Sequence, residues 1–179
     1  MVDYEKLAEL GAQCGFTHTA QLDISTLVFM QEVRDMWNAT QCDRYGTSWS
    51  CPPACASLED LRTRVLEYSH GVLVQTVGEI EDSYDWDAIL ENGLTHKANF
   101  GKMWDVLERD YPTVFAMGAG ACMLCETCTY PDNPCRRPER LSASMEACGL
   151  LVSKVCTDNG VKYNYGQDKI AFTACFLLK

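Results

Sequence analysis

Four cysteines lie within fourteen residues in the second half of the chain. Cys122, Cys125 and Cys128 follow one another at intervals of three, and Cys135 closes the group. Thiolates at this spacing can wrap one corner of a metal cluster, as the C-x2-C-x2-C run of bacterial ferredoxins does. Residues 130–134 are rich in turn formers, so they can bring the fourth cysteine back to the other three. The loop at about 122–135 therefore predicts a metal site, with iron–sulfur as the first candidate.

Zinc and disulfides are the alternatives for this loop. Structural zinc sites usually pair two C-x2-C knuckles about a dozen or more residues apart, which a triplet with a close fourth cysteine does not reproduce. Disulfides are disfavoured because eleven cysteines is an odd number and the first residues carry no basic and apolar signal segment. In a reducing compartment, cysteines at this density are more often ligands. We therefore expect a cytoplasmic protein with a [4Fe-4S] cluster, and zinc as the alternative metal.

A second group of cysteines occupies a loop at about 42–55. Cys42, Cys51 and Cys55 share it with Gly46, which permits a tight turn, and with two prolines that restrict the backbone. A rigid loop of this kind can hold thiolates for a second cluster. The competing interpretation makes these cysteines small buried hydrophobic residues in a packed corner. Metal ligation is preferred, although the spacing matches no general template.

Three thiolates leave one coordination position unexplained. An open position is where a catalytic metal does its chemistry, so this second site is a candidate substrate site. In that two-cluster version the four-cysteine site relays electrons. Otherwise another cysteine completes the set, although ligation is the preferred expectation for none of them. A core or packing role is expected for Cys148 and Cys14, Cys156 lies beside the apolar stripe of Cys148, and Cys175 could point either way. The cysteines in question are Cys14, Cys148, Cys156 and Cys175.

Side chains beside the cysteines suggest how a cluster would be tuned. Tyr45, Trp49 and Tyr130 are candidates for shielding it from water. Arg136 and Arg137 would offset its charge or bind an anion, and a solvated pair of arginines is an equally good interpretation. Hydrogen bonds, burial and nearby charge all set the potential of a cluster.

Composition limits the class of protein. With 179 residues, of which 47 % are hydrophobic, residues 1–179 can form a single domain with its own core. The net charge of −10 argues against a nucleic-acid partner, because no basic stripe exists to displace counterions. No apolar stretch approaches the length of a membrane span.

Hydrophobic periodicity predicts an α/β fold in which helices and strands alternate. Gly93 weakens the longest helical pattern and is a candidate break. Ser57, with Asp60 three residues later, forms a variant of the capping box. The expected helices are 3–14, 27–37, 57–66, 83–110 and 138–158, and the expected strands are 16–24, 71–77, 113–117 and 169–178.

The two cysteine loops together resemble the predicted metal-binding proteins of domain-of-unknown-function family 2284. The matching segments are C-x2-YG-x2-WSCPP-x-C at residues 42–55, G-x-C-x2-C-x2-CTYPD at 120–132 with Cys135-Arg136, SMEA at 144–147, GLLV at 149–152 and Y-x-YG at 163–166. The resemblance implies a small cytoplasmic metal protein of prokaryotes, often anaerobes. It implies metal binding by the seven loop cysteines, and it implies no particular reaction.

The leading hypothesis is an iron–sulfur protein with one or two [4Fe-4S] clusters. It would act in electron transfer, or in a reductive step on a small molecule or a partner cofactor, with a redox protein or that small molecule as partner. A zinc-binding module that presents a docking surface is the alternative from another class. A chaperone that passes a metal cluster to another protein is the third hypothesis.

Overall fold

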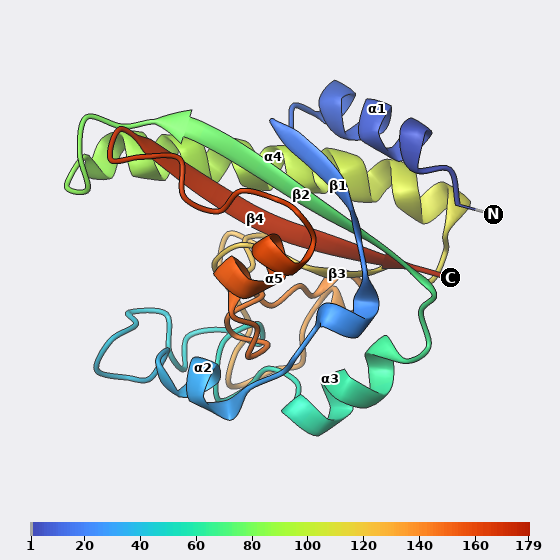
Figure 1. Ribbon diagram of the computed structural model, residues 1–179. Coiled ribbons are helices and arrows are strands. Elements are labelled where there is room, and N and C mark those ends of the chain that lie inside the picture. Colours follow the sequence, from blue (N-terminus) through green and yellow to red (C-terminus); the bar gives the residue numbers. More distant parts are fainter. Residues whose placement is uncertain (1) are drawn as a thin grey trace.

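The computed structural model describes residues 2–179 and shows a mixed fold built on one antiparallel sheet (Figure 1). The strand order is β1-β2-β4-β3, so the C-terminal strand lies inside the sheet. The two long central strands pair over ten residues, with His70 opposite Leu178 and Glu79 opposite Lys169. The strands are β1 (His18–Leu22), β2 (His70–Glu79), β3 (Phe115–Met117) and β4 (Lys169–Leu178).

Helices alternate with these strands along the chain, as the sequence predicts. At the first helix, the Asp3 carboxylate accepts hydrogen bonds from the backbone of Glu5 and Lys6, and Gly15 ends the helix with a φ of 100°. The Ser57 hydroxyl likewise accepts from the Asp60 backbone at 3.0 Å. The helices are α1 (Tyr4–Cys14), α2 (Gln31–Asp35), α3 (Leu58–Val65), α4 (Trp86–Asp110) and α5 (Val152–Asp158), with 3-10 turns at Ile24–Thr26 and Pro138–Arg140.

The sheet separates two hydrophobic cores. Helices α1 and α4 cover one face, and α3, α5 and the cysteine loops lie toward the other (Figure 1). Alternate residues of a strand point to opposite faces. Val72 and Phe176 therefore face α4, whereas Leu73 and Cys175 face α5. Both faces are buried, so β2 and β4 each carry an apolar run, Val72–Val74 and Ala174–Leu178, beside the buried polar residues Gln75, Thr76 and Thr173.

The predicted helix at 27–37 is mostly absent, and only α2 remains of it. Phe29 instead forms an isolated antiparallel bridge with Leu150, and the Met30 N–H donates to the Gly149 carbonyl at 2.8 Å. These contacts hold the segment extended. Pairing with a distant segment therefore overrides the local helical spacing.

The predicted helix at 138–158 is also wrong over its first two thirds. Pro138 begins only a single 3-10 turn, and Gly118 then forms a parallel bridge with Ser144. Gly149 has a φ of 82°, and a side chain there would lie 2.6 Å from the Met30 carbonyl oxygen. The helix begins only at Val152 and ends before Asn159, at the predicted stop.

Helix α4 runs unbroken through Gly93 for 25 residues. A Cβ at Gly93 would lie 3.3 Å from the Phe172 ring, so the glycine lets the helix pass close to β4. Packing on the sheet offsets the intrinsic penalty of about 1 kcal/mol for a glycine inside a helix. No helix within residues 2–179 is both long and apolar enough to cross a membrane.

Because His96 of α4 is buried, we expect the protein to lose stability in acid. Its ring is buried, and Nδ1 lies 2.9 Å from the Thr76 hydroxyl. Burial lowers its pKa from 6.5 to about 4, and the charge of Lys97 acts in the same direction. Below about pH 6.5 the His96 imidazole therefore becomes protonated in the unfolded chain, whereas in the native state it stays neutral until about pH 4.

We expect the lowered pKa of His96 to reduce the free energy of unfolding by about 3 kcal/mol as the pH falls from 6.5 to 4. The measurement is urea unfolding at pH 7 and pH 4.5 for the parent and for His96→Gln. The variant should show the smaller loss between the two pH values. An equal loss in both proteins would contradict a buried neutral imidazole.

Candidate metal centre

The loop with four cysteines leaves β3 and folds back on itself. The Asn133 N–H donates to the Thr129 carbonyl at 3.0 Å, and the Thr129 hydroxyl donates to the Pro134 carbonyl at 2.8 Å. The Arg136 guanidinium donates to the Thr127 carbonyl at 2.8 Å and closes the loop at its base. The turn expected at 130–134 therefore exists. The Arg136 side chain stabilises this loop by its hydrogen bond to Thr127, a role that the sequence did not suggest.

All four cysteines of this loop line one cavity of about 30 Å³, here called the four-cysteine cavity. Two buried serines of the other cysteine loop, Ser48 and Ser50, also line it. Burial raises the pKa of Cys122, and the nearby Cys135 and Cys125 raise it further. Charge on one of these thiols therefore disfavours charge on the next, which is the repulsion that a bound cation would remove.

The thiols do not yet form a coordination shell. Across residues 2–179, no three His, Cys, Asp or Glu side chains stand in a geometry that could hold a metal ion. The chemistry of the donor set nevertheless fits a soft metal, since four thiols and no carboxylate or imidazole line the cavity. The residues that would hold a metal here are Cys122, Cys125, Cys128 and Cys135.

The three cysteines of the first loop are divided between two cavities. Cys42 and Cys51 line a cavity of about 360 Å³ that faces β4, here called the sheet cavity. Cys55 lines a different cavity with Arg34, and its thiol lies 3.7 Å from the Ala147 carbonyl. Burial raises the pKa of Cys55, and the positive charge of Arg34 acts against that shift. The geometry thus supports a shared site for two of the three.

Direct contacts join the two cysteine loops. The Cys122 N–H donates to the Ser50 hydroxyl at 3.0 Å. The Trp49 indole donates to the Asn133 carbonyl at 3.0 Å, and its ring meets the Tyr130 ring edge-on with centroids 5.0 Å apart. The first loop is therefore one wall of the four-cysteine cavity. Trp49 lines that cavity as expected, whereas Tyr45 lines the cavity of Cys55.

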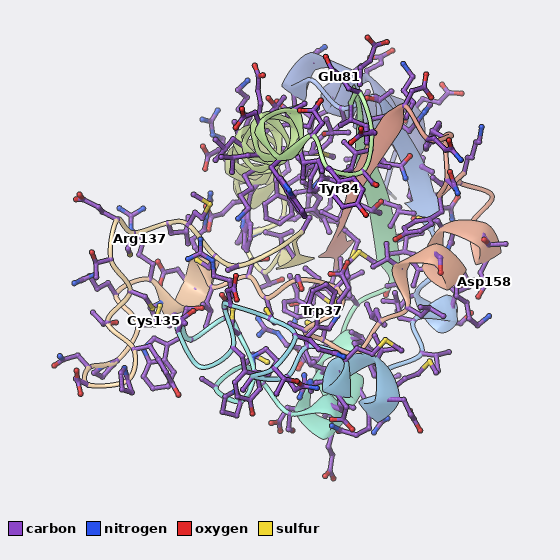
Figure 2. The ribbon with its side chains drawn as sticks, turned by 90° about the vertical axis from the view of Figure 1, so that its left-hand side faces the viewer. Trp37, Glu81, Tyr84, Cys135, Arg137 and Asp158 are labelled. Atoms are coloured by element: carbon purple, nitrogen blue, oxygen red, sulfur yellow. The ribbon has the colours of Figure 1, made fainter. Side chains whose placement is uncertain are left out.

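Two cations fix the backbone around the cysteines. The Lys97 ammonium, from α4, donates to the Ala121 carbonyl at 2.7 Å, one residue before Cys122. The Arg34 guanidinium donates to the carbonyls of Ala56 and Ala147, each at 2.8 Å, beside Cys55. Sequence spacing gave no signal for either residue, because each acts on a segment that is distant along the chain. Arg137 is exposed, and Figure 2 shows it with Cys135 at the outer edge of the molecule.

Trp49→Phe tests the joint between the loops. The substitution keeps an aromatic ring against Tyr130 and removes the donor to Asn133, a loss worth about 1 kcal/mol. We expect trypsin to cleave after Arg136 roughly fivefold faster in native protein, as that energy implies. Trp86→Phe is the matched control, because Trp86 is 69 % exposed and lines neither loop. Equal cleavage rates in both variants would show that the Trp49 hydrogen bond does not hold the two loops together.

The other four cysteines lie in the hydrophobic cores, as predicted for Cys14 and Cys148, and Cys175, whose direction the sequence left open, lies in the core between the sheet and α5. Cys14 packs under α1, and Cys148, Cys156 and Cys175 pack on the opposite face of the sheet. Burial raises the pKa of Cys175 to about 12 and raises that of Cys148 as well. These thiols are held in the neutral form. None of them lines the four-cysteine cavity.

Comparison with known protein families decides how these loops are classified. A family model described as a predicted metal-binding protein, DUF2284, matches residues 20–178. The chain belongs to this family. The match includes both cysteine loops and three of the four strands in full, and it confirms the resemblance found in the sequence. No curated protein and no solved structure matches the chain.

Proposed function

We propose that this member of the family is an iron–sulfur protein with a [4Fe-4S] cluster at the 122–135 loop. The observation that carries the proposal is that four thiols from one short loop line a single cavity. The ligands would be Cys122, Cys125, Cys128 and Cys135, and the bound cluster would supply one-electron chemistry. Ser48, Ser50 and Trp49 form the wall that limits access of water to this cavity.

The position of the loop supports a role in electron transfer. Cys135 lies at the periphery of the molecule, well apart from Trp37 near the middle of the same view (Figure 2). Met123 and Leu124, inside the C-x2-C-x2-C run, are 59 % and 39 % exposed. A redox partner protein could therefore approach the thiols closely across an apolar surface. Small contacts of this kind suit brief redox encounters.

We propose a second site made of two of the three cysteines of the first loop. Cys42 and Cys51 share the sheet cavity, whereas Cys55 lines the neighbouring cavity, and Pro52 lines both. Two thiols facing a cavity of ligand size suit a place where a small molecule meets the redox centre better than a closed second cluster. A cluster at Cys42, Cys51 and Cys55 would require Cys55 to leave its contact with Ala147.

Reversible bleaching tests the redox proposal. Protein purified without oxygen should show a broad visible band that dithionite bleaches and a mild oxidant restores. A colourless protein with bound zinc would overturn it and favour a structural zinc module. Iron that transfers rapidly and completely to an apo-ferredoxin would favour a cluster chaperone. A cluster chaperone would also show a band that bleaches, so the transfer assay, and not the spectrum, separates it from a redox protein.

A further inference from the structure

The sheet cavity has the size and shape of a small-molecule site. Its volume is about 360 Å³, within the usual range for ligand pockets, which begins near 300 Å³. The first cysteine loop, the 119–121 segment, α5 and strand β4 each contribute to its walls. Most of the lining is apolar and partly aromatic. The apolar and aromatic lining side chains include Trp37, Val152, Tyr163, Ala171 and Phe172.

One cation in the sheet cavity has no partner. The Arg44 side chain makes no hydrogen bond or ion pair with any group in residues 2–179. Lys97 stands close by, behind the 119–121 segment. Burial lowers the pKa of Lys97, and repulsion by Arg44 lowers it further. The Lys97 ammonium donates to the Ala121 carbonyl and does not line the cavity, so Arg44 is the lining cation that is open to an anion.

A carboxyl group lies in the same cavity and does not neutralise Arg44. Glu146 lines it, yet no ion pair joins Glu146 to Arg44 within the described chain. Burial raises the pKa of Glu146. The Tyr163 hydroxyl, which also lines the cavity, can donate a hydrogen bond. The cavity thus offers one guanidinium, one phenol hydroxyl and aromatic walls, with the Glu146 carboxyl not paired to that guanidinium.

These features specify an organic anion with a flat apolar body. A guanidinium fork matches a carboxylate in a paired, planar contact. Phosphate would require more charged donors than a single lining arginine, and it would make no use of the Phe172 and Trp37 surfaces. Apolar and aromatic walls with few polar groups are typical of sites for small organic ligands.

We propose that the sheet cavity binds a small aromatic carboxylate, with Arg44 pairing with its carboxylate and the ring lying against Phe172 beside Cys42 and Cys51. The inference deepens the proposed function, on which it rests only for calling this ligand a substrate. Binding itself depends on the side chains of the chain. A failure of one proposal can therefore be told from a failure of the other.

Benzoate is the probe, titrated into anaerobically purified protein and followed by calorimetry and by the Trp37 indole signal in NMR. We expect a dissociation constant of about 1 mM or tighter, which nine non-hydrogen atoms can supply. Arg44→Ala should weaken binding at least about tenfold, since a charged hydrogen bond is lost, and Arg44→Lys should fall between the two. Because Arg44 is exposed, neither change should affect folding.

Controls separate the specific contact from general effects. Arg109→Ala removes an exposed arginine of α4 that lines none of these cavities, and it should leave benzoate affinity unchanged. Benzamide, which lacks the charge, should bind more weakly and be indifferent to Arg44. Inorganic phosphate should not compete with benzoate.

Two results would overturn the cavity proposal. One is the absence of benzoate binding to protein with full iron content, which would leave the proposed cluster standing. The other is binding that survives Arg44→Ala or is displaced by phosphate. Arginine-dependent benzoate binding to colourless, zinc-bound protein would support the cavity and refute the iron–sulfur function instead.

Discussion

Cys125→Ser should abolish the visible band and reduce bound iron from about four atoms per chain to none or to a labile remnant. Cys125 is the middle thiol of the triplet that lines the four-cysteine cavity. A hydroxyl is a poor ligand for a soft metal, so three thiolates would have to hold a cluster through an incomplete shell. Iron, acid-labile sulfide and the spectrum are measured together on anaerobically purified protein.

Two matched variants define what that result means. Thr127→Ser changes an exposed hydroxyl-bearing side chain two residues away and should retain the parent iron content and spectrum. Cys42→Ser removes a thiol of the sheet cavity and should also retain them if the chain holds one cluster. Full iron and an unchanged band in Cys125→Ser would refute the ligand assignment. Loss of half the iron in Cys42→Ser would establish a second cluster.

Phe176→Ala should lower the free energy of unfolding by about 3–5 kcal/mol, the usual range for deleting a buried phenylalanine ring. Phe176 is completely buried in β4. Its ring stacks on Phe100 with centroids 4.7 Å apart and meets Trp104 at 6.2 Å, edge-on. The cavity left by the truncation would lie between the sheet and α4.

The test is urea unfolding, with Tyr84→Ala as the control. Tyr84 is 77 % exposed and lies in the turn between β2 and α4 (Figure 2), so its truncation should change stability by about 0.5 kcal/mol or less. Folded Phe176→Ala should keep the parent metal content per chain, because the two cores lie on opposite faces of the sheet. A loss below 1 kcal/mol would contradict the packing described for α4.

Strands β2, β3 and β4 were predictable because each contains an apolar segment that the local pattern defines, whereas β1 is mostly polar and was expected from loose alternation alone. The two wrong helices share one physical cause. Phe29 and Met30 pair with Leu150 and Gly149, more than a hundred residues away, and this pairing holds both segments out of helical geometry. Their apolar spacing fits a helix equally well, so periodicity could not separate the alternatives. Gly93 failed as a break because its contact with Phe172 is also distant along the chain.

In the candidate site too, features set by the local sequence were predictable and contacts between distant segments were not. The four-cysteine loop is local, and its spacing with the turn at 130–134 was enough to place all four thiols on one cavity. The first loop is local too, yet its spacing could not reveal that Cys55 turns toward Ala147. Neither Lys97 nor Ser50 carries a motif, and both are found only through contacts with the segment around Cys122.

Metal and sulfide content per chain, after purification under strict exclusion of oxygen, tests the central claim most directly. A single [4Fe-4S] cluster on the 122–135 loop predicts about four iron and four sulfide per chain. Eight of each would add a second cluster and would require Cys55 to join Cys42 and Cys51. One zinc without sulfide would contradict the account, and would make the four-cysteine cavity a structural metal site.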